Sequence, residues 1–341
     1  MHSNRETEAA SGLSLPLPKL TLGTAQLGMP DYGIANDTGG ADTCALLEGS
    51  VSAGITSFDT SPEYGESEKV IGEFLALSNR AQEMAVMTKV KLPRQLGMTE
   101  KEVAAHMYAS LEGSLSRLQL RKLPVLKLHD PDILVTHGET VTRTLRSMRS
   151  EGLIAAGGIS LTDRTDEQYR RIAAFLEDDI YAFVQAPLNL LDHRLQASGA
   201  MQRMQATGKT IVARSVYLQG LLLMNPERLP NNLQEAAPAL HSLRLLAEQE
   251  GISVAQLAFS YVRDMDGVAS LIIGIEKQAQ LEENLRLLQG PALSERCLHA
   301  IRTQLGHIPE RIITPALWNR NGSGNRGTIP AASADTSETS K

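Results

Sequence analysis

The chain has 341 residues, of which 42% are hydrophobic and 21% are charged, and its formal net charge is −6 with a pI of about 5.8. This balance is typical of a globular protein, and it disfavours nucleic acid and anionic membranes as partners. The two cysteines, Cys44 and Cys297, lack metal-ligand spacing, so we predict reduced thiols and no metal site.

The two ends of the chain differ in composition from its middle. Met1 to Ser14 is polar and lacks a signal-peptide core, and no apolar run approaches the roughly 20 residues of a membrane span, so we expect a cytoplasmic protein. The tail from Asn321 onward is rich in Gly, Ser, Thr and Ala. We predict a flexible N-terminus over residues 1–17 and a disordered tail over residues 319–341.

Between these ends, short apolar segments alternate with longer segments of helical periodicity. The predicted strands are 19–25, 55–59, 84–90, 125–129, 155–161, 182–189, 210–216 and 270–275. The predicted helices are 42–53, 66–77, 99–118, 139–150, 166–176, 198–206, 240–249, 253–263 and 278–288. Glycines such as Gly54 and Gly208 directly follow helical segments, where helices commonly end.

This alternation predicts the fold. Strands that are each followed by a helix must run parallel and be joined by right-handed crossovers. Eight such units favour an α/β protein with a single (β/α)8 TIM barrel over residues 18–318. A doubly wound open sheet is the alternative, but the Gly-x-Gly-x-x-Gly signature after the first strand is absent.

Polar residues stand at the carboxyl ends of the predicted strands, which form one rim in a barrel. They are Asp59 with Tyr64 in its loop, Lys89, His129, Ser160, Gln185, Arg214 and Ser215. Each alone is explained by a turn, a cap or a solvated charge. Together they converge on one mouth, which favours a functional site.

The residues after the second, third and fourth predicted strands suit proton transfer. The Tyr64 phenol has an ordinary pKa of about 10 and is a weak acid at neutral pH. We expect a contact with the Lys89 ammonium to lower that pKa, and Asp59 to hold the lysine in place. With His129 orienting a carbonyl group, this set could protonate a carbonyl oxygen while a cofactor supplies hydride.

Several motifs carry a family resemblance. They are Leu22-Gly23-Thr24, Phe58-Asp59-Thr60, Glu63-Tyr64-Gly65, Thr88-Lys89-Val90, Leu128-His129-Asp130, Gly158-Ile159-Ser160, Val184-Gln185, Arg214-Ser215, Leu218-Gln219-Gly220, and Gly274 with Gln280-Leu281-Glu282-Glu283-Asn284. In this order, over roughly residues 19 to 290, they resemble the aldo-keto reductase family, and in detail a bacterial subgroup of it. The resemblance implies a (β/α)8 barrel.

The resemblance also implies roles for individual residues. Tyr64 would be the general acid/base, tuned by Asp59 and Lys89, and His129 would position the substrate carbonyl. The residues implied to contact the cofactor are Gly23, Thr24, Ser160 and Gln185 at the nicotinamide, Ser215, Gln219 and Gly220 at the pyrophosphate, and Gln280, Glu283 and Asn284 at the adenosine end. The family uses no metal.

The sequence departs from the family pattern in three places. Leu161 stands where an Asn usually binds the carboxamide, and Arg214 where an aromatic ring usually stacks on the nicotinamide. After Gly274 come Glu276, which would repel a 2′-phosphate, and Lys277, which would attract it. These two residues act in opposite directions, so the choice rests on the resemblance to the family, which implies NADP as the cofactor, with NAD as the alternative.

The leading function is hydride transfer between a nicotinamide and a carbonyl or alcohol carbon of a small polar substrate. Aromatic residues make up 4% of the chain, which favours a sugar-like substrate over a large hydrophobic one. Two alternatives stay open: redox-neutral epimerisation or elimination on a sugar, and a non-catalytic regulatory barrel that binds the cofactor. No sequence feature selects a reaction direction or an oligomeric state.

Overall fold

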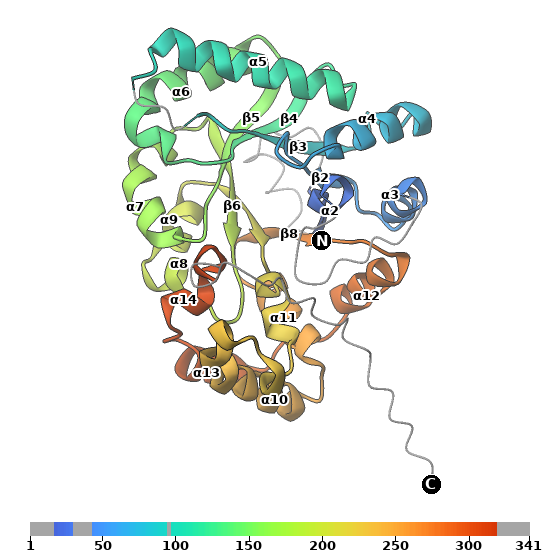
Figure 1. Ribbon diagram of the computed structural model, residues 1–341, viewed down its shortest axis with the longest axis vertical. Helices are drawn as coiled ribbons and strands as arrows, with labels where there is room; N and C mark the ends of the chain where they lie inside the picture. The colour runs from blue at the N-terminus through green and yellow to red at the C-terminus, as the bar shows by residue number, and fades with distance from the viewer. Residues whose placement is uncertain (1–16, 30–42, 94–96, 319–341) are drawn as a thin grey trace.

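The computed structural model describes residues 17–29, 43–93 and 97–318 (Figure 1). The predicted disordered tail and nearly all of the predicted flexible N-terminus lie outside these ranges. Leu17, the last residue of that N-terminal segment, packs against the apolar cluster of the sheet. Within the described ranges, no helix combines the length and the apolar character needed to cross a membrane.

The described residues form a closed barrel of eight parallel strands in sequence order, with β1 pairing with both β2 and β8. The strands are β1 Leu20–Gly23, β2 Ser57–Asp59, β3 Ala85–Val90, β4 Leu123–Leu128, β5 Ile154–Ser160, β6 Tyr181–Pro187, β7 Thr210–Arg214 and β8 Val268–Gly274. The predicted (β/α)8 barrel is confirmed.

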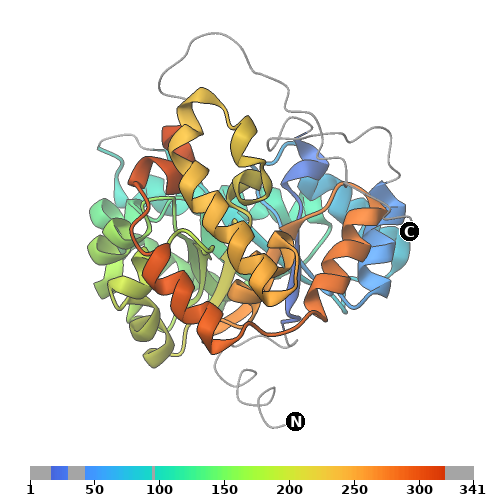
Figure 2. The same cartoon turned by 90° about the horizontal axis from the view of Figure 1, so that it is seen from below.

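Helices surround the strands on all sides (Figures 1 and 2). They are α2 Ala25–Gly28, α3 Thr43–Ser52, α4 Ser67–Ser78, α5 Glu100–Leu118, α6 Ile133–Ser150, α7 Thr165–Leu176, α8 Arg194–Ala197, α9 Ala200–Ala206, α10 Ala237–Glu250, α11 Val254–Arg263, α12 Gln278–Leu288, α13 Glu295–Gln304 and α14 Glu310–Ile313. Short 3₁₀ turns are η1 Leu218–Leu223, η2 Pro226–Arg228, η3 Asn231–Ala236 and η4 Pro315–Leu317.

Local chemistry sets several of these boundaries. α5 begins with a capping box, in which Thr99 and Glu102 satisfy each other's backbone N–H groups. α6 begins at Ile133, well before the predicted residue 139, because Leu134 is buried and tertiary packing extends the helix across a break at His137. The predicted first strand ends early, at Gly23, and α2 follows it.

The interior of the barrel is layered. Met87, Val125, Ala156, Phe183 and Val212, from five different strands, form one buried apolar cluster. Because side chains alternate along a strand, the residues two positions further along share the same interior. Those residues include Lys89, Lys127 and Gln185, so a polar layer lies above the apolar one, toward the carboxyl ends of the strands.

Candidate active site

Asp59, Lys89 and Tyr64 form one connected group. The Lys89 Nζ atom donates to Asp59 Oδ2 at 2.8 Å, to the Thr60 carbonyl at 2.8 Å and to Tyr64 Oη at 3.2 Å. The side chains of Lys89 and Asp59 are only 1% and 3% exposed. The lysine therefore connects a buried carboxylate to the phenol at the mouth of the barrel.

His129 lies beside this group, one residue after β4. Its ring is perpendicular to the Tyr64 ring, with the centroids 6.0 Å apart. Its Nδ1 atom lies 3.2 Å from Ser61 Oγ, in the loop that also carries Tyr64. The structure thus brings together all four residues predicted to be catalytic.

Burial and charge set the protonation of these groups. Burial alone would raise the pKa of Asp59, but the charges of Lys127 and Lys89 outweigh it and hold that pKa at about 2. Burial, with a smaller effect of Lys89, lowers the pKa of His129 to about 4, so the imidazole is neutral at neutral pH.

The predicted lowering of the Tyr64 pKa is wrong. Loss of solvent, and then the charge of Asp59, raise its pKa above the ordinary value, although Arg214 acts in the opposite direction. The phenol is therefore held protonated. That state suits a proton donor, and the Lys89 ammonium can still stabilise the oxygen when the proton leaves.

Lys127 is a charged member of the site that the sequence interpretation missed. Its Nζ atom donates to Asp59 Oδ1, and to Gln185 Oε1 at 2.6 Å. The available signal was the two-residue spacing between Lys127 in β4 and His129 just after it, because side chains two positions apart along an extended segment point to the same side.

Ser160 and Gln185, predicted at the nicotinamide, are cross-strand partners at the ends of β5 and β6. Both are buried, and the Ser160 hydroxyl makes no hydrogen bond to another described residue. Gly23 pairs in register with Asp59 and with Gly274 at the same rim. Thr24 follows, but its hydroxyl donates to the Asp59 carbonyl at 3.0 Å, so it also holds β1 and β2 together.

Arg214 ends β7 and reaches across to the end of β5. Its guanidinium donates to the Leu161 carbonyl at 2.8 Å and to Ser215 Oγ at 2.9 Å, and it lies 3.4 Å from Asp163 Oδ1. Arg214 and Leu161, two departures from the family pattern, are therefore direct neighbours.

A run of left-handed backbone follows Arg214. Ser215, Leu218, Gln219 and Gly220 have φ values of 59°, 48°, 54° and 93°. Positive φ is uncommon outside glycine, and its clustering is typical of ligand-binding loops. Ser215, Gln219 and Gly220 are the three residues predicted at the pyrophosphate.

The residues predicted at the adenosine end surround the start of α12. Gln280 Oε1 accepts from the backbone N–H of Glu276 at 2.6 Å and of Lys277 at 3.3 Å. Asn284 donates to the Gln280 carbonyl at 2.7 Å, and Glu283 pairs with Arg286. Burial and then the charge of Glu283 raise the pKa of Tyr217, which indicates that α12 and the η1 loop are neighbours.

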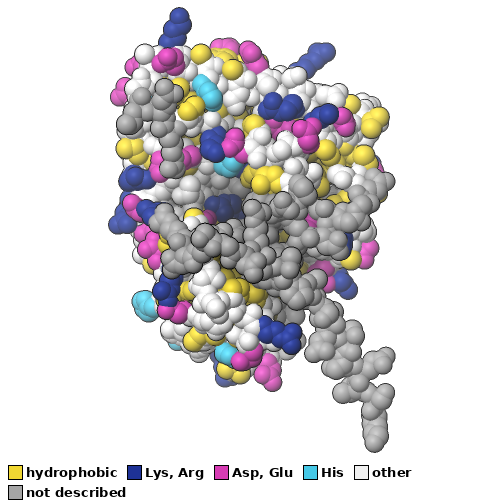
Figure 3. Space-filling view, viewed as in Figure 1, with side chains coloured by type: hydrophobic (Ala, Val, Ile, Leu, Met, Phe, Trp, Pro, Cys, Tyr) yellow, Lys and Arg dark blue, Asp and Glu magenta, His cyan; other side chains and the backbone are white. Residues whose placement is uncertain are grey.

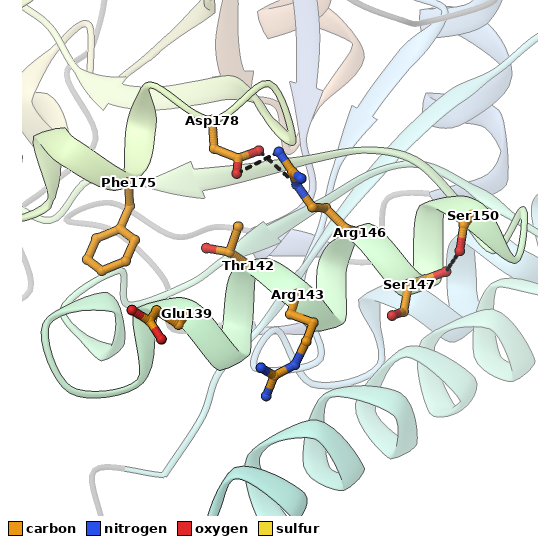
Figure 4. A pocket seen from close by; sticks show the side chains of 8 residues that line it. All are labelled: Glu139, Thr142, Arg143, Arg146, Ser147, Ser150, Phe175 and Asp178. Atoms are coloured by element: carbon orange, nitrogen blue, oxygen red, sulfur yellow. Dashed lines mark hydrogen bonds and ion pairs between the residues drawn. The ribbon is translucent and has the colours of Figure 1, made fainter.

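A separate hollow lies on the outer surface, among residues of α6 and α7 and the turn after α7 (Figure 4). None of the four predicted catalytic residues lines it, and its two arginines are paired, Arg146 with Asp178 and Arg143 with Glu100. In the described part of the chain, no group of three or more His, Cys, Asp or Glu side chains is arranged to hold a metal ion. On the described part of the face shown in Figure 3, acidic and basic side chains are interspersed.

Known proteins resemble this chain over most of its length. It is 27% identical over 289 residues to L-glyceraldehyde 3-phosphate reductase of Escherichia coli, covering 75% of this chain and 82% of the relative. An aldo-keto reductase of Bacillus halodurans in its holo form has the same fold, with a TM-score of 0.67, 21% identity, and coverage of 88% of this chain and 98% of that one. An aldo/keto reductase of Klebsiella pneumoniae, solved with NADP and acetate, has a TM-score of 0.61 and 22% identity. The match covers 85% of this chain and 92% of that one.

The family model matches residues 19–303, which include every strand of the barrel and all the predicted site residues. The chain belongs to the aldo/keto reductase family and is an NAD(P)-dependent reductase or dehydrogenase.

Proposed function

We propose that this enzyme transfers a hydride between NADP(H) and the carbonyl or alcohol carbon of a small polar, sugar-like substrate in the cytoplasm, with Tyr64 as general acid/base. The observation that carries the proposal is the position of Lys89 Nζ, 2.8 Å from Asp59 Oδ2 and 3.2 Å from Tyr64 Oη. A phenol is a useful acid only if its anion is stabilised as the proton leaves, and the ammonium does this.

His129 would orient the substrate carbonyl. The Ser61 hydroxyl accepts from the Glu63 backbone N–H at 3.2 Å, and in the proposed arrangement its own hydrogen donates to His129 Nδ1. The neutral ring would then carry its proton on Nε2, which can donate to a carbonyl oxygen next to the Tyr64 hydroxyl. Two donors would thus meet the oxygen on which negative charge develops.

The opposite side of the rim fits a nicotinamide dinucleotide. Ser160, which is 5% exposed at the rim, and its cross-strand neighbour Gln185 offer a hydroxyl and an amide that suit a carboxamide. The residues we assign to the cofactor are Gly23, Thr24, Ser160, Gln185, Arg214, Ser215, Gln219, Gly220, Gly274, Lys277, Gln280, Glu283 and Asn284. When bound, the reduced cofactor supplies the hydride.

Two observations favour NADP over NAD, and a third favours a sugar-like substrate. Lys277 is exposed at the start of α12, where it can meet a 2′-phosphate. The Klebsiella structure of the same fold was solved with NADP. The E. coli relative is named for reduction of a three-carbon sugar phosphate, which supports a small polar substrate here.

The test combines binding with turnover. Wild type is titrated with NADPH and NADH and then assayed on a panel of aldoses, small aldehydes and ketones, beside Tyr64→Phe. We expect Tyr64→Phe to lower kcat by about 10²- to 10⁴-fold without changing the Kd of the nucleotide. Tyr108→Phe is the matched control, because its phenol donates to Glu151 on the outer surface.

Three outcomes would contradict the proposal. An unimpaired Tyr64→Phe variant would rule out the mechanism. Tight nucleotide binding without turnover of any panel member would favour a regulatory barrel. Product formation with no net change in the amount of reduced cofactor would favour a redox-neutral reaction.

A further inference from the structure

Lys127 is a second lysine inside the barrel. It is the cross-strand partner of Lys89 in the pairing of β3 with β4, and its side chain is 2% exposed. Like charges side by side on neighbouring strands are destabilising. The pair is tolerated because one carboxylate, Asp59, accepts from both ammonium groups.

The neighbouring strand leaves room for this side chain. Gly158 pairs with Lys127 in the register of β4 with β5. A Cβ atom at Gly158 would lie 3.1 Å from Lys127 Cγ and 2.6 Å from the Phe183 carbonyl oxygen. The absence of a side chain on β5 is therefore part of the packing around the lysine, and the cation is built into the interior.

Lys127 also fixes the Gln185 amide. Its Nζ atom lies 2.6 Å from Gln185 Oε1, while Gln185 Nε2 lies 3.4 Å from Asp59 Oδ2. An ammonium group has donors and no acceptor, so the amide must turn its oxygen toward Lys127. The NH₂ group of Gln185 is then directed away from Lys127 and can donate to a carbonyl-type oxygen.

Two buried lysines share one carboxylate in this interior. Asp59 accepts from both Lys89 and Lys127, and burial lowers the pKa of Lys89 as it does that of Lys127. Burial lowers the pKa of Lys127 to about 8, with Lys89 and Arg214 acting in the same direction and Asp59 against them. At neutral pH most of Lys127 is still protonated. The proposed proton transfer also requires the Lys89 ammonium, so two ammonium groups then face one carboxylate, and the surplus positive charge lies 2.6 Å from Gln185 Oε1.

We propose that Lys127 is a positioning residue of the cofactor site that fixes the Gln185 amide and, through its surplus charge, makes the site prefer reduced NADPH to oxidised NADP⁺. The reduced nicotinamide ring is neutral and the oxidised ring is a cation, so the surplus charge weakens binding of the oxidised form alone. This inference rests on the proposed function, in which Gln185 binds the nicotinamide carboxamide. It increases the fraction of the enzyme that carries NADPH when both nucleotides are present.

Calorimetric titration with NADPH and with NADP⁺ tests the inference on wild type, Lys127→Met and Lys127→Gln. Lys127→Met removes both the charge and the donor. Its ratio of the NADP⁺ Kd to the NADPH Kd should fall about tenfold, the scale of one unit charge acting across several ångströms of protein interior. Its NADPH Kd should also rise a few-fold, because the Gln185 amide is released.

Lys127→Gln separates the two effects. It removes the charge but keeps an NH₂ donor for Gln185. The ratio of the NADP⁺ Kd to the NADPH Kd should therefore fall as in Lys127→Met, while the NADPH Kd itself stays near that of wild type. It also keeps the test available if Lys127→Met fails to fold, as judged by circular dichroism and Tm. Lys122→Gln is the matched control, because Lys122 is exposed just before the other end of β4.

The outcomes are distinguishable. A ratio unchanged in the folded Lys127 variants would overturn the role of Lys127 and leave the proposed function intact. A fall of the same size in Lys122→Gln would show a general charge effect and would also overturn it. A wild-type protein that binds neither nucleotide would refute the proposed function, and this inference with it.

Discussion

The two sides of the barrel mouth are built in different ways. On the side of β2, β3 and β4, Asp59, Lys89 and Lys127 are almost fully buried, and both lysines bond directly to the Asp59 carboxylate. On the side of α12, Gln280 and Glu283 are exposed and bond to residues three or four positions away in the sequence. One side is a buried charge network, whereas the other is a set of surface groups.

This difference follows from solvation. A charge that has lost its water must be satisfied inside the protein, so the proton-transfer side is organised before any ligand arrives. An exposed group is hydrated and can exchange a neighbour or water for a ligand at little cost. We therefore expect substitutions on the buried side to change catalysis and folding strongly, and those at α12 to change mainly cofactor affinity.

The largest effect should come from Lys89→Met. It removes the donor to Tyr64 Oη, so kcat should fall about a thousandfold, within the range of general acid catalysis. The fold should survive, because Lys127 still neutralises Asp59. Steady-state kinetics with a Tm measurement checks both points. Lys91→Met is the control, since this exposed lysine pairs with Glu63; an equal loss of kcat there would contradict the assignment.

Next in size is the stability effect of Asp59→Asn. This variant leaves two buried cations without their carboxylate, and the free energy of unfolding should fall by about 3–5 kcal/mol. Asp163→Asn should cost less than about 1 kcal/mol, because Asp163 is partly exposed and Arg214 stays bonded to the Leu161 carbonyl. Urea unfolding measures both. If Asp59→Asn and Asp163→Asn lost similar amounts of unfolding free energy, the buried carboxylate would be no more important for folding than the partly exposed one.

The pH dependence of stability tests the burial of His129. Its pKa is about 4 in the folded protein and 6.5 in the unfolded chain, so below pH 6.5 the unfolded chain takes up a proton that the folded protein refuses until about pH 4. Stability is thus lost as the pH falls through this window. His129→Gln should be less sensitive than wild type between pH 7.5 and 5, by about 1–2 kcal/mol after allowance for the partly exposed ring. The check is the free energy of unfolding measured at several pH values for both proteins. The same dependence on pH in wild type and His129→Gln would contradict the prediction.

The sequence could predict the features that depend on local pattern. Strand–helix alternation predicted the barrel, because parallel strands need crossovers, and strand-end positions brought Asp59, Lys89 and His129 into one mouth. Lys127 was missed because it stands inside a strand, where a buried lysine is unusual and only its contacts explain it. The direction of the Tyr64 pKa was wrong because neighbouring charge is visible in a sequence and loss of solvent is not.

Boundaries depended on packing that the sequence does not display. The segment Ile133 to Thr136 has a β-branched, apolar composition that does not favour a helix, yet burial of Leu134 makes it the start of α6. α13, Glu295–Gln304, was not predicted; it is held by the Ser294 cap and by burial of Cys297 and Ile301. Both are cases in which tertiary contacts outweigh local preference.

The smallest effect should come from Lys277→Ala at the start of α12. Losing one exposed cation should weaken NADPH binding about tenfold, the scale of a charge-assisted hydrogen bond to phosphate, and leave NADH binding unchanged because NADH lacks the 2′-phosphate. Titration with both nucleotides gives the two Kd values. Lys101→Ala, which removes an exposed lysine on α5, controls for net charge.

The folding stability of Lys277→Ala should match that of wild type, because an exposed side chain contributes little to it. An equal weakening of NADPH and NADH would remove Lys277 from the phosphate site. A large loss of stability would show that this side of the mouth, like the other, is organised before the cofactor binds.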